Sequence, residues 1–298
     1  MKLCVCIPVY NFDVRELVYD LKKQASESNI DVEILLIDDA SDDYIKLLNN
    51  ELDLYVESFV MLEKNVGRSQ IRNLFLYYSS GDYLLFLDCD GKIINSNFLK
   101  NYIDYINDNQ GVKVIYGGRI VSDEEPDKDH LLRWKFAKER ENLPVESRRE
   151  KPYLSFQTNN FVVKRSVLKK VNFNPQFQKY GYEDLLFAMD LQSENIQIAH
   201  IENPIYNNDL ESNEVYLKKV EESVESLHRM IKSRTIYPKI QDIKLVKVYR
   251  KFQQSGTGFA FKKLFAIRRK RIAEKLISGE ASLRYLDFYK LGLLLEKE

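Results

Sequence analysis

The chain of 298 residues is poor in cysteine, proline and glycine, with 3, 7 and 11 of them. The cysteines (Cys4, Cys6 and Cys89) lie inside apolar runs and make no disulfide framework, so we expect a reduced, cytoplasmic compartment. So little glycine and proline excludes collagen-like and low-complexity sequence. No apolar run approaches the roughly 18 residues of a membrane span, and the start of the chain has no cleavage site of a secretory signal. These absences favour one large folded domain or two small ones.

The sequence also lacks several signatures of catalysis and metal binding. Its three histidines (His130, His200 and His228) do not have metal-ligand spacing. No nucleophile elbow, phosphate-binding Walker loop or paired-cysteine zinc site is present. Any chemistry must therefore come from other side chains.

Positive and negative charges balance over the whole chain but not along it. Lysine plus arginine and aspartate plus glutamate number 45 each. Between Lys239 and Lys275, however, there are twelve basic residues and two acids, so this segment has ten excess positive charges and the rest has ten excess negative charges. The basic segment suggests an anionic partner. We do not expect a nucleic acid, because no aromatic-interleaved strand motif or zinc finger is present and the acidic body would repel phosphate.

Apolar runs alternate with helical patterns through the N-terminal half. Residues 3–9, 32–37 and 83–87 form short, nearly continuous apolar runs, as expected for strands buried on both faces of a sheet. Apolar residues at helical spacing follow at residues 14–26, 67–78 and 98–107. This alternation predicts an α/β fold, with a mostly parallel sheet flanked by helices.

Two later segments break the alternation. Residues 122–151 are dense in charge and poor in periodicity, and we expect a mobile loop or lid there. From Val215 onward the pattern is helical, apart from a break at residues 255–258. We place a domain boundary near Glu211, with residues 1–211 as one domain and 212–298 as a helical, basic C-terminal extension.

Acidic residues follow the predicted strands at the edge where ligands bind in parallel sheets. Asp88 and Asp90 come directly after a buried strand, and i and i+2 side chains of extended backbone project to the same side. Two hard oxygen ligands suit Mg²⁺ or Mn²⁺, which could bridge to a diphosphate. The alternative is a solvated turn. Asp38 and Asp39 follow another strand and could accept hydrogen bonds from a nucleobase or ribose, or cap the helix after Asp42 or Tyr44.

Three further side chains have a functional and a structural interpretation. Tyr10 could stack on a base or belong to the core, and Arg72 could face a phosphate or lie on the surface. Glu183 and Asp184 open a predicted helix, where acids are favoured by the helix dipole alone. In a cleft, such a carboxylate could take the proton of an attacking hydroxyl as a general base.

Taken together, these segments resemble the family 2 glycosyltransferases with the GT-A fold. The resemblance covers roughly residues 2–211 and rests on the order and spacing of six pieces. They are residues 6–11 (CIPVYN), 36–41 (LIDDAS), 65–67 with 72–73 (NVG and RN), 87–90 (LDCD), 159–161 (NNF) and 180–184 (YGYED). The resemblance implies a Rossmann-like, nucleotide-diphospho-sugar transferase fold with a mostly parallel sheet and helices on both faces.

The resemblance also implies where a nucleotide-sugar would bind. Tyr10 and Asp39 would hold the base, beside backbone contacts from Pro8 and Val9. The remaining donor and metal contacts would come from Asp38 next to the base, Arg72 near the base or phosphates, Asp88 at the ribose or the metal, and Asp90 on the metal. The metal would be Mn²⁺ or Mg²⁺.

The implied activity is inverting sugar transfer from a nucleotide-sugar, most simply a UDP-sugar, to a saccharide or lipid-linked saccharide hydroxyl. Asp184 would be the catalytic base, with Glu183 positioning the acceptor, and polysaccharide synthesis for the cell envelope would be the setting. The family inverts the anomeric centre by one direct displacement, so no protein nucleophile is needed.

Two departures from the family pattern bear on the metal. Gly91 stands where many members have a further aspartate, and Asn207 stands where many have a histidine. A carboxamide is a weaker metal ligand than imidazole, so Asn207 is either a weak third ligand or none.

The basic C-terminal segment contains one amphipathic pattern. Apolar residues Phe261, Leu264, Phe265, Ile272 and Leu276 share a helical stripe flanked by lysine and arginine. Such a helix could lie on the anionic inner face of a membrane, or dock on the protein with its basic face solvated.

Two other functions compete with sugar transfer. Residues 84–91 (LLFLDCDG) resemble the nucleophile motif of haloacid-dehalogenase-like phosphohydrolases, in which Asp88 would attack phosphate and Asp90 would be the acid/base. Against this, Lys92 replaces the usual threonine, and two strand-plus-acid units precede the motif. A catalytically inactive nucleotide-sugar-binding homologue is the other alternative, because Gly91 and Asn207 depart from the family pattern.

Overall fold

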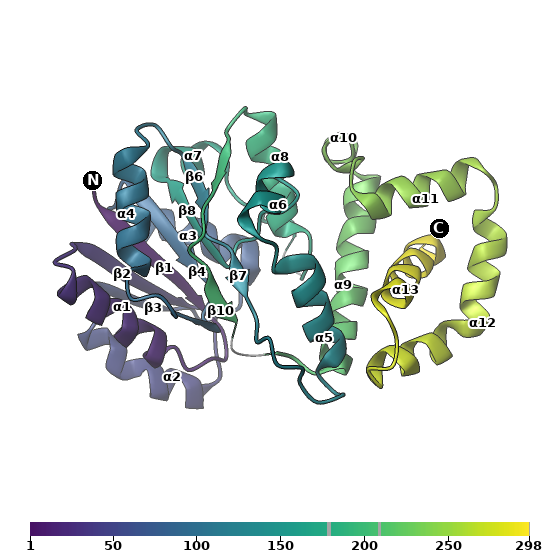
Figure 1. Cartoon of the computed structure of the whole chain (residues 1–298), viewed down its shortest axis with the longest axis horizontal. Coiled ribbons are helices and arrows are strands. Elements are labelled where there is room, and N and C mark those ends of the chain that lie inside the picture. The colour runs from purple at the N-terminus through teal and green to yellow at the C-terminus, as the bar shows by residue number, and fades with distance from the viewer. Residues whose placement is uncertain (178–179, 208–209, 298) are drawn as a thin grey trace. The chain divides into compact units, whose positions relative to one another are not determined.

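The computed structural model describes residues 1–177, 180–207 and 210–297 (Figure 1). The described chain divides into two compact units. The first comprises Met1–Val121, Glu141–Gln178 and Glu183–Asp209, and the second comprises Ser122–Arg140, Lys179–Tyr182 and Leu210–Glu298. The second unit thus includes two stretches that lie N-terminal to the predicted boundary at Glu211, and that boundary stays a prediction.

A seven-stranded sheet forms the centre of the first unit, in the order β3-β2-β1-β4-β8-β6-β9. Its strands are β1 (Leu3–Val9), β2 (Val32–Asp38), β3 (Ser58–Met61), β4 (Tyr83–Leu87), β6 (Val114–Tyr116), β8 (Asn160–Lys164) and β9 (Ile198–His200). All pairs are parallel except those that β8 makes with β4 and β6. The predicted α/β fold with a mostly parallel sheet is confirmed.

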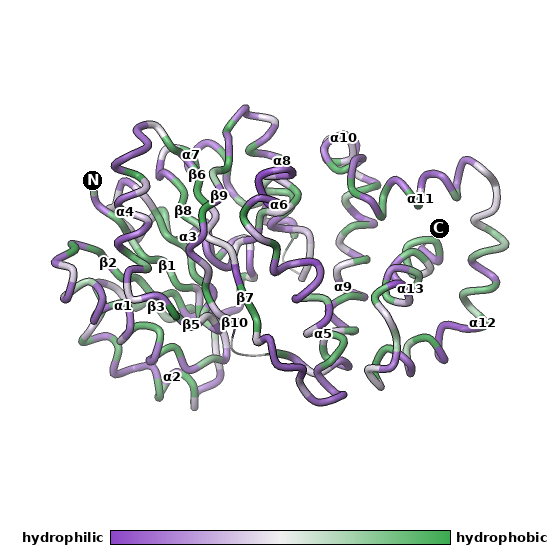
Figure 2. The backbone as a smooth tube through the Cα atoms, in the orientation of Figure 1, coloured by the Kyte–Doolittle hydropathy of each residue, from purple (hydrophilic) through white to green (hydrophobic). Residues whose placement is uncertain are grey.

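Helices cover both faces of this sheet, because alternate residues of its strands point to opposite sides. Val5 and Ile7 of β1 lie in one apolar core, and Cys4 and Cys6 lie in the other. Strands β1 and β4 are accordingly apolar along their whole length (Figure 2). Helices α1 (Arg15–Glu27) and α4 (Phe98–Asp108) supply the first core, and α3 (Gly67–Tyr78), α7 (Arg165–Lys170) and α8 (Glu183–Ser193) supply the second.

A smaller sheet adjoins the acidic residues that follow β4. It has three short strands in the order β5-β10-β7, namely β5 (Gly91–Lys92), β10 (Ile205–Asn207) and β7 (Arg119–Ile120). The remaining elements of the first unit are α2 (Asp43–Asn49), the 3₁₀ helix η1 (Asn50–Leu54) and α6 (Val145–Glu150). The pairing of β10 with β5 places Asn207 opposite Gly91.

Residues 122–151 are not the loop that their charge density predicts. They contain α5 (Leu131–Phe136), the π-helix η2 (Ala137–Glu141) and α6. The side chain of Arg148 explains the difference in α6: it is buried and donates to the carbonyls of Leu143 and Ile201, both at 3.0 Å. A helix held by a buried arginine need not have apolar residues at helical spacing. The sequence pattern therefore did not predict this helix.

The second unit is helical. Besides α5 and η2, its helices are α9 (Asn213–Lys232), α10 (Tyr237–Ile240), α11 (Lys244–Gln254), α12 (Gly258–Ile277) and α13 (Leu283–Glu296). The predicted break at residues 255–258 separates α11 from α12. Within the described residues, no helix is both long and apolar enough to cross a membrane.

The apolar stripe of the basic segment packs inside this unit. Phe265, Ile272 and Leu276 are at most 6% exposed, and the Phe261 ring lies 4.7 Å from that of Phe288. Only Leu264 of the five residues is substantially exposed. Of the two alternatives for this stripe, docking on the protein is the one observed, because α12 contacts α9 and α13 within the bundle. Contact of the basic helices with a membrane stays a prediction.

Candidate active site

The loops that follow β1 and β2 are joined by hydrogen bonds. The Asp39 amide donates to the Val9 carbonyl at 2.8 Å, and the Asn11 amide donates to Ser41 Oγ at 2.8 Å. Asn11 and Ala40 both have a positive φ, a conformation that costs a non-glycine residue free energy. These contacts hold the turn after Pro8 and Val9 in a fixed shape and leave the Tyr10 side chain 54% exposed.

The two acids after β2 have different surroundings. Asp39 accepts from the amides of Val66 and Gly67 at 2.7 and 3.1 Å, so it holds the start of α3 rather than that of α2. Burial raises the pKa of the Asp39 carboxyl. Asp38 is fully buried; its Oδ1 accepts from the Ser41 amide, and its Oδ2 has no partner among the described residues. The burial of Asp38 opposes a direct nucleotide contact.

The Asp-x-Asp acids lie at the carboxyl end of β4. Arg72 of α3 donates to Asp88 Oδ1 at 2.8 Å and is only 2% exposed. Arg72 therefore orients the Asp88 carboxylate, and its predicted place near the base or phosphates stays a prediction. The Asp88 amide donates to the Asn159 carbonyl at 3.0 Å, so strand β8 supports the same turn. Burial and the nearby charge of Asp88 raise the pKa of Asp90.

Two oxygen-bearing groups near each other suit a divalent cation. The close charges of Asp88 and Asp90 repel, and a cation between them would relieve that repulsion. Asn207 donates from Nδ2 to Asp90 Oδ2 at 3.0 Å, which leaves its amide oxygen as a further acceptor. Within the described residues, no group of three or more His, Cys, Asp or Glu side chains could hold a metal ion. The donor set fits a metal whose other ligands come from a bound diphosphate and water.

Gly91 leaves no room for the further aspartate of the family pattern. A Cβ atom built on Gly91 would lie 2.3 Å from Cδ1 of Ile205. The side chain of Ile205, on β10, thus occupies the space next to the Asp-x-Asp turn. Glycine is required here by close packing against that strand.

Glu183 and Asp184 begin helix α8, directly after two residues with positive φ, Gly181 and Tyr182. The Glu183 carboxylate is 7% exposed and lies 3.9 Å from Arg68, on α3. Burial, followed by the charge of Glu183, raises the pKa of Asp184 to about 7. A carboxyl group with such a pKa can accept a proton near neutral pH.

Arginines link the two acidic pairs within the first unit. The charge of Arg68, which approaches Glu183, also lowers the pKa of Asp90. The charge of Arg72, which binds Asp88, also lowers the pKa of Asp184. The structure therefore brings the Asp-x-Asp turn and the start of α8 into one electrostatic neighbourhood.

Arg119 of β7 is a site residue that the sequence analysis missed. It is 8% exposed and donates from Nη1 to Glu141 at 2.9 Å, while its Nε and Nη2 are buried without a partner among the described residues. Its positive charge lowers the pKa of Asp90. Two unused donors next to an acidic pair are typical of an anion-binding arginine. No local motif marks it, because β7 meets the site only through the small sheet.

A hollow of about 150 Å³ opens beside Asp90, on the side of α1. Its lining includes Asp13, Glu16 and Asp20, and its lysine, Lys92, is paired with Glu16 at 2.6 Å. The hollow is smaller than ligand pockets usually are, and its acids would repel a diphosphate.

Comparisons with known proteins agree with this geometry. Over 115 residues the chain is 31% identical to a poly(ribitol-phosphate) beta-glucosyltransferase of Bacillus spizizenii. The matched region covers 37% of this chain and 18% of that protein. It is 26% identical over 250 residues to an uncharacterized glycosyltransferase of Haemophilus influenzae, covering 82% and 91% of the two chains. The chain thus spans less than a fifth of the Bacillus relative.

Two solved structures have the same fold at low sequence identity. The mannosyltransferase PcManGT of Pyrobaculum calidifontis, in complex with GDP-Man and Mn²⁺, matches with a TM-score of 0.60 and 13% identity, over 99% of this chain and 88% of the other. TarS 1-349 of S. aureus, in complex with UDP-GlcNAc, matches with a TM-score of 0.52 and 19% identity, over 98% and 90%. Both structures have the predicted fold, and both hold a bound nucleotide-sugar.

The family model described as "Glycosyl transferase family 2" matches residues 4–172, more than half of the chain. This match gives no support to the phosphohydrolase alternative, whose motif would also lie on the first strand of its sheet and not on β4. The α/β architecture with a helical C-terminal part, the acids at the strand ends and the family match agree, and the chain belongs to the family 2 glycosyltransferases with the GT-A fold.

Proposed function

We propose that this glycosyltransferase transfers a sugar from a UDP-sugar, with inversion, to a hydroxyl of a saccharide or lipid-linked saccharide. The observation that carries the proposal is the raised pKa of Asp184, a base poised near neutral pH, in the electrostatic neighbourhood of the Asp-x-Asp turn. The UDP-GlcNAc bound to TarS supports a UDP-sugar as donor.

The nucleotide is proposed to lie across the ends of β1, β2 and β4. The exposed Tyr10 ring stacks on the base, with Pro8 and Val9 forming the backbone beneath it. Asp39 accepts from the base, because each of its carboxylate oxygens has a lone pair beyond the bonds to α3. Asp88, held by Arg72, accepts from a ribose hydroxyl.

A divalent metal, Mn²⁺ or Mg²⁺, is proposed to be held by Asp90 and Asp88, with the amide oxygen of Asn207 as a weak third ligand. When bound, the metal neutralises charge on the diphosphate leaving group. Mn²⁺ in the PcManGT complex supports a divalent metal in this fold. The unused donors of Arg119 give the diphosphate a second source of positive charge.

Asp184 is proposed as the general base. Its carboxylate takes the proton of the acceptor hydroxyl while that oxygen attacks the anomeric carbon. The bond between the anomeric carbon and the diphosphate oxygen breaks, and the nucleoside diphosphate leaves with the bonding electrons. Attack opposite the leaving group inverts the configuration. Glu183, paired with Arg68, positions the acceptor.

We further propose that transfer takes place in the cytoplasm, at the inner face of a membrane, in polysaccharide synthesis for the cell envelope. Residues 1–211 would be the catalytic domain. The Bacillus relative acts, by its name, on a poly(ribitol-phosphate), which supports a polymer of the envelope as acceptor class.

One assay tests the donor, the metal and the activity. The protein is incubated with Mn²⁺ or Mg²⁺ and a set of nucleotide-sugars, and thermal unfolding and slow release of free nucleotide are followed. We expect a UDP-sugar with metal to raise the melting temperature and to be hydrolysed slowly. A thermal shift without any release or transfer would identify an inactive binding protein, and the absence of a shift with every nucleotide-sugar would contradict the proposed donor site.

A further inference from the structure

Helix α12 of the second unit has one face docked within its bundle and one face exposed. Phe265 and Leu276 are fully buried, and a Cβ on Gly292 of α13 would lie 2.3 Å from the Phe265 ring, so the two helices pack closely. The docked face therefore needs no further partner. The opposite face is exposed and is considered next.

That opposite face combines large apolar side chains with positive charge. The residues lie three or four positions apart and so share one side of the helix. We call this set the outer face of α12, and it consists of Phe259, Lys263, Leu264, Ile267, Lys270 and Arg271. Ile267 is 82% exposed, Phe259 is 68% exposed and Leu264 is 43% exposed. Three large apolar side chains in water on one helix are unusual enough to indicate a binding surface.

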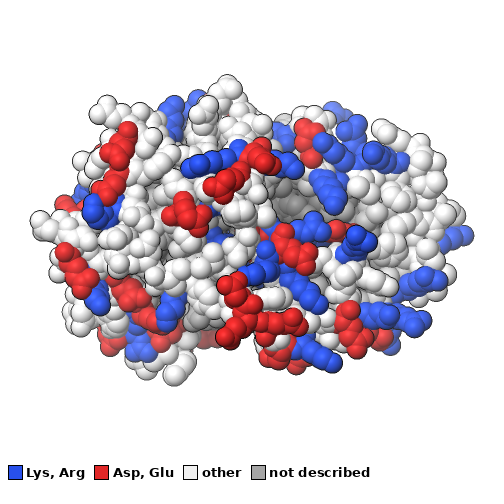
Figure 3. Space-filling view, viewed as in Figure 1, with Lys and Arg blue, Asp and Glu red and all other residues white. Residues whose placement is uncertain are grey.

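Most charges on and beside this face lack an ion-pair partner among the described residues, and Lys263 lies over the ring of Phe259, 4.5 Å from its centroid. Among the described residues, Lys262, Arg268, Lys270 and Arg271 have no ion pair. By contrast, Arg269, which points toward the bundle, pairs with Glu296 at 3.0 Å. The one acid of α12 is Glu274, near its C-terminal end. Lysine and arginine accordingly gather over α11 and α12 in the space-filling view (Figure 3). The surface is complementary to an anionic partner.

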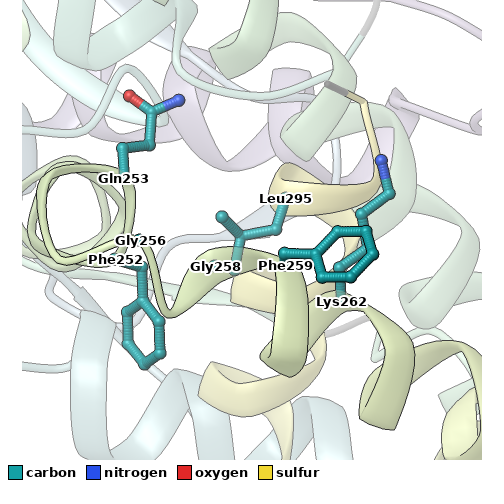
Figure 4. A pocket seen from close by; sticks show the side chains of 7 residues that line it. All are labelled: Phe252, Gln253, Gly256, Gly258, Phe259, Lys262 and Leu295. Atoms are coloured by element: carbon teal, nitrogen blue, oxygen red, sulfur yellow. The ribbon is translucent and has the colours of Figure 1, made fainter.

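A hollow at the start of α12 extends this surface. It has a volume of about 320 Å³, and its lining comprises Phe252, Phe259 and Leu295, the polar side chains Gln253 and Lys262, and Gly256 and Gly258. In Figure 4, Leu295 lies between Phe252 and Phe259, and Lys262 stands next to Phe259. Three large apolar side chains beside a lysine suit a group that is anionic at one end and hydrocarbon at the other.

We propose that the outer face of α12 binds the surface of an anionic lipid bilayer. Phe259, Leu264 and Ile267 would enter the headgroup region, while Lys263, Lys270 and Arg271 would contact lipid phosphates. A soluble polyanion would use the cations alone and would gain nothing from an exposed isoleucine. The apolar residues therefore favour a bilayer. This surface would hold the protein at the membrane, the location proposed above. The inference rests on that proposed location but not on the proposed donor site.

Vesicle flotation with the full chain tests the proposal. We expect binding to vesicles of phosphatidylcholine with phosphatidylglycerol, little binding to phosphatidylcholine alone, and weaker binding at high salt. Each lysine or arginine at an anionic surface contributes roughly a fivefold factor, so K263Q/K270Q/R271Q should weaken binding about 100-fold. The apolar variant F259S/I267S should also lose most of the binding.

Two controls show whether a loss of vesicle binding comes from this surface, from the total charge of the protein or from damage to the active site. The variant K23Q/K64Q/K169Q removes the same charge from exposed positions of the first unit and should bind as the unaltered protein does. All variants should keep the thermal shift and nucleotide release measured with a UDP-sugar, so a failure of the donor assay would not bear on this inference.

Two results would overturn it. One is the absence of binding to anionic vesicles, or equal binding by the unaltered protein and the charge variant. The other is binding to inorganic polyphosphate that the charge variant loses, together with vesicle binding that F259S/I267S retains in full, since this would identify a purely ionic site for a polyanion.

Discussion

Nδ2 of Asn207 donates to Oδ2 of Asp90 at 3.0 Å, so a neutral amide lies beside the second aspartate of the Asp-x-Asp turn. The amide donor stabilises the charged form of Asp90, but an amide oxygen binds a divalent cation weakly. This pair suggests that metal affinity in this chain is set at position 207.

Replacing Asn207 by histidine should strengthen Mn²⁺ binding. An imidazole nitrogen is a better ligand for this ion than a carboxamide oxygen, and we expect about a tenfold lower Kd in the presence of UDP. Titration calorimetry measures the effect. Asn107→His, at an exposed position on α4, is the matched control. Equal Mn²⁺ affinity in both variants would show that residue 207 does not reach the metal.

Restoring the aspartate of the family pattern at position 91 should destabilise the protein without improving metal binding. The new Cβ would clash with Ile205, and overpacking of this kind costs about 1–3 kcal/mol. Urea unfolding measures the loss. In G91D/I205A the clash is removed and part of the stability should return; a G91D variant as stable as the unaltered protein would refute the packing argument.

Asp184→Asn should abolish most of the transfer activity. The amide cannot accept the acceptor's proton, and removal of a general base typically lowers kcat by about 10²–10⁴-fold. The KM for the donor should change little, because Asp184 is proposed to act on the acceptor hydroxyl and not to bind the donor. Asp190→Asn, on the same helix α8, is the control and should remain active. Retained turnover in the Asp184 variant would remove it as the base.

The same residue should give the protein a characteristic pH dependence. Its pKa is about 7 in the folded protein, well above that of an exposed aspartate, so between about pH 4 and 7 the folded state binds more protons than the unfolded state. This group therefore lowers the unfolding free energy as the pH rises through that window, while the active, ionised fraction increases. Urea midpoints at pH 4.5 and 7 should fall more steeply for the unaltered protein than for Asp184→Asn. Parallel slopes would contradict the raised pKa.

Gly292→Ala should destabilise the helical unit even though alanine favours helix formation. The added methyl group would meet the Phe265 ring, and the overpacking outweighs the gain in helix propensity of up to about 1 kcal/mol. Gly258→Ala is the control, because its Cβ would make only ordinary contacts and its φ is not positive. We expect a lower thermal midpoint for the first variant and an unchanged or higher one for the second.

The sequence was sufficient for those parts of the molecule that local chemistry determines. Strands such as β1 and β4 are buried on both faces and so appear as continuous apolar runs, and the acids at their ends follow directly. The family resemblance then gave the fold. The roles of Tyr10, Asp39, Asp90 and Asp184 stay predictions, to be tested by the experiments above.

The features that the sequence did not predict depend on contacts between residues far apart in the chain. Arg119 enters the site through the small sheet, and Ile205 fills the space beside Gly91 from more than a hundred residues away. The ion pair between Arg72 and Asp88 also joins residues from two separate elements, and no local pattern indicates it. Periodicity within α12 identified an apolar stripe correctly but not which element would cover it.

Asp39 has a consequence for the dynamics of donor binding. Its carboxylate holds the first residues of α3, and α3 carries Arg72, which in turn holds Asp88. Helix α3 thus joins Asp39, the proposed contact of the base, to Asp88, the proposed contact of the ribose. A nucleotide that displaces Asp39 on binding would shift Asp88 through helix α3. Recognition of the nucleobase and alignment of the ribose and diphosphate would then be coupled.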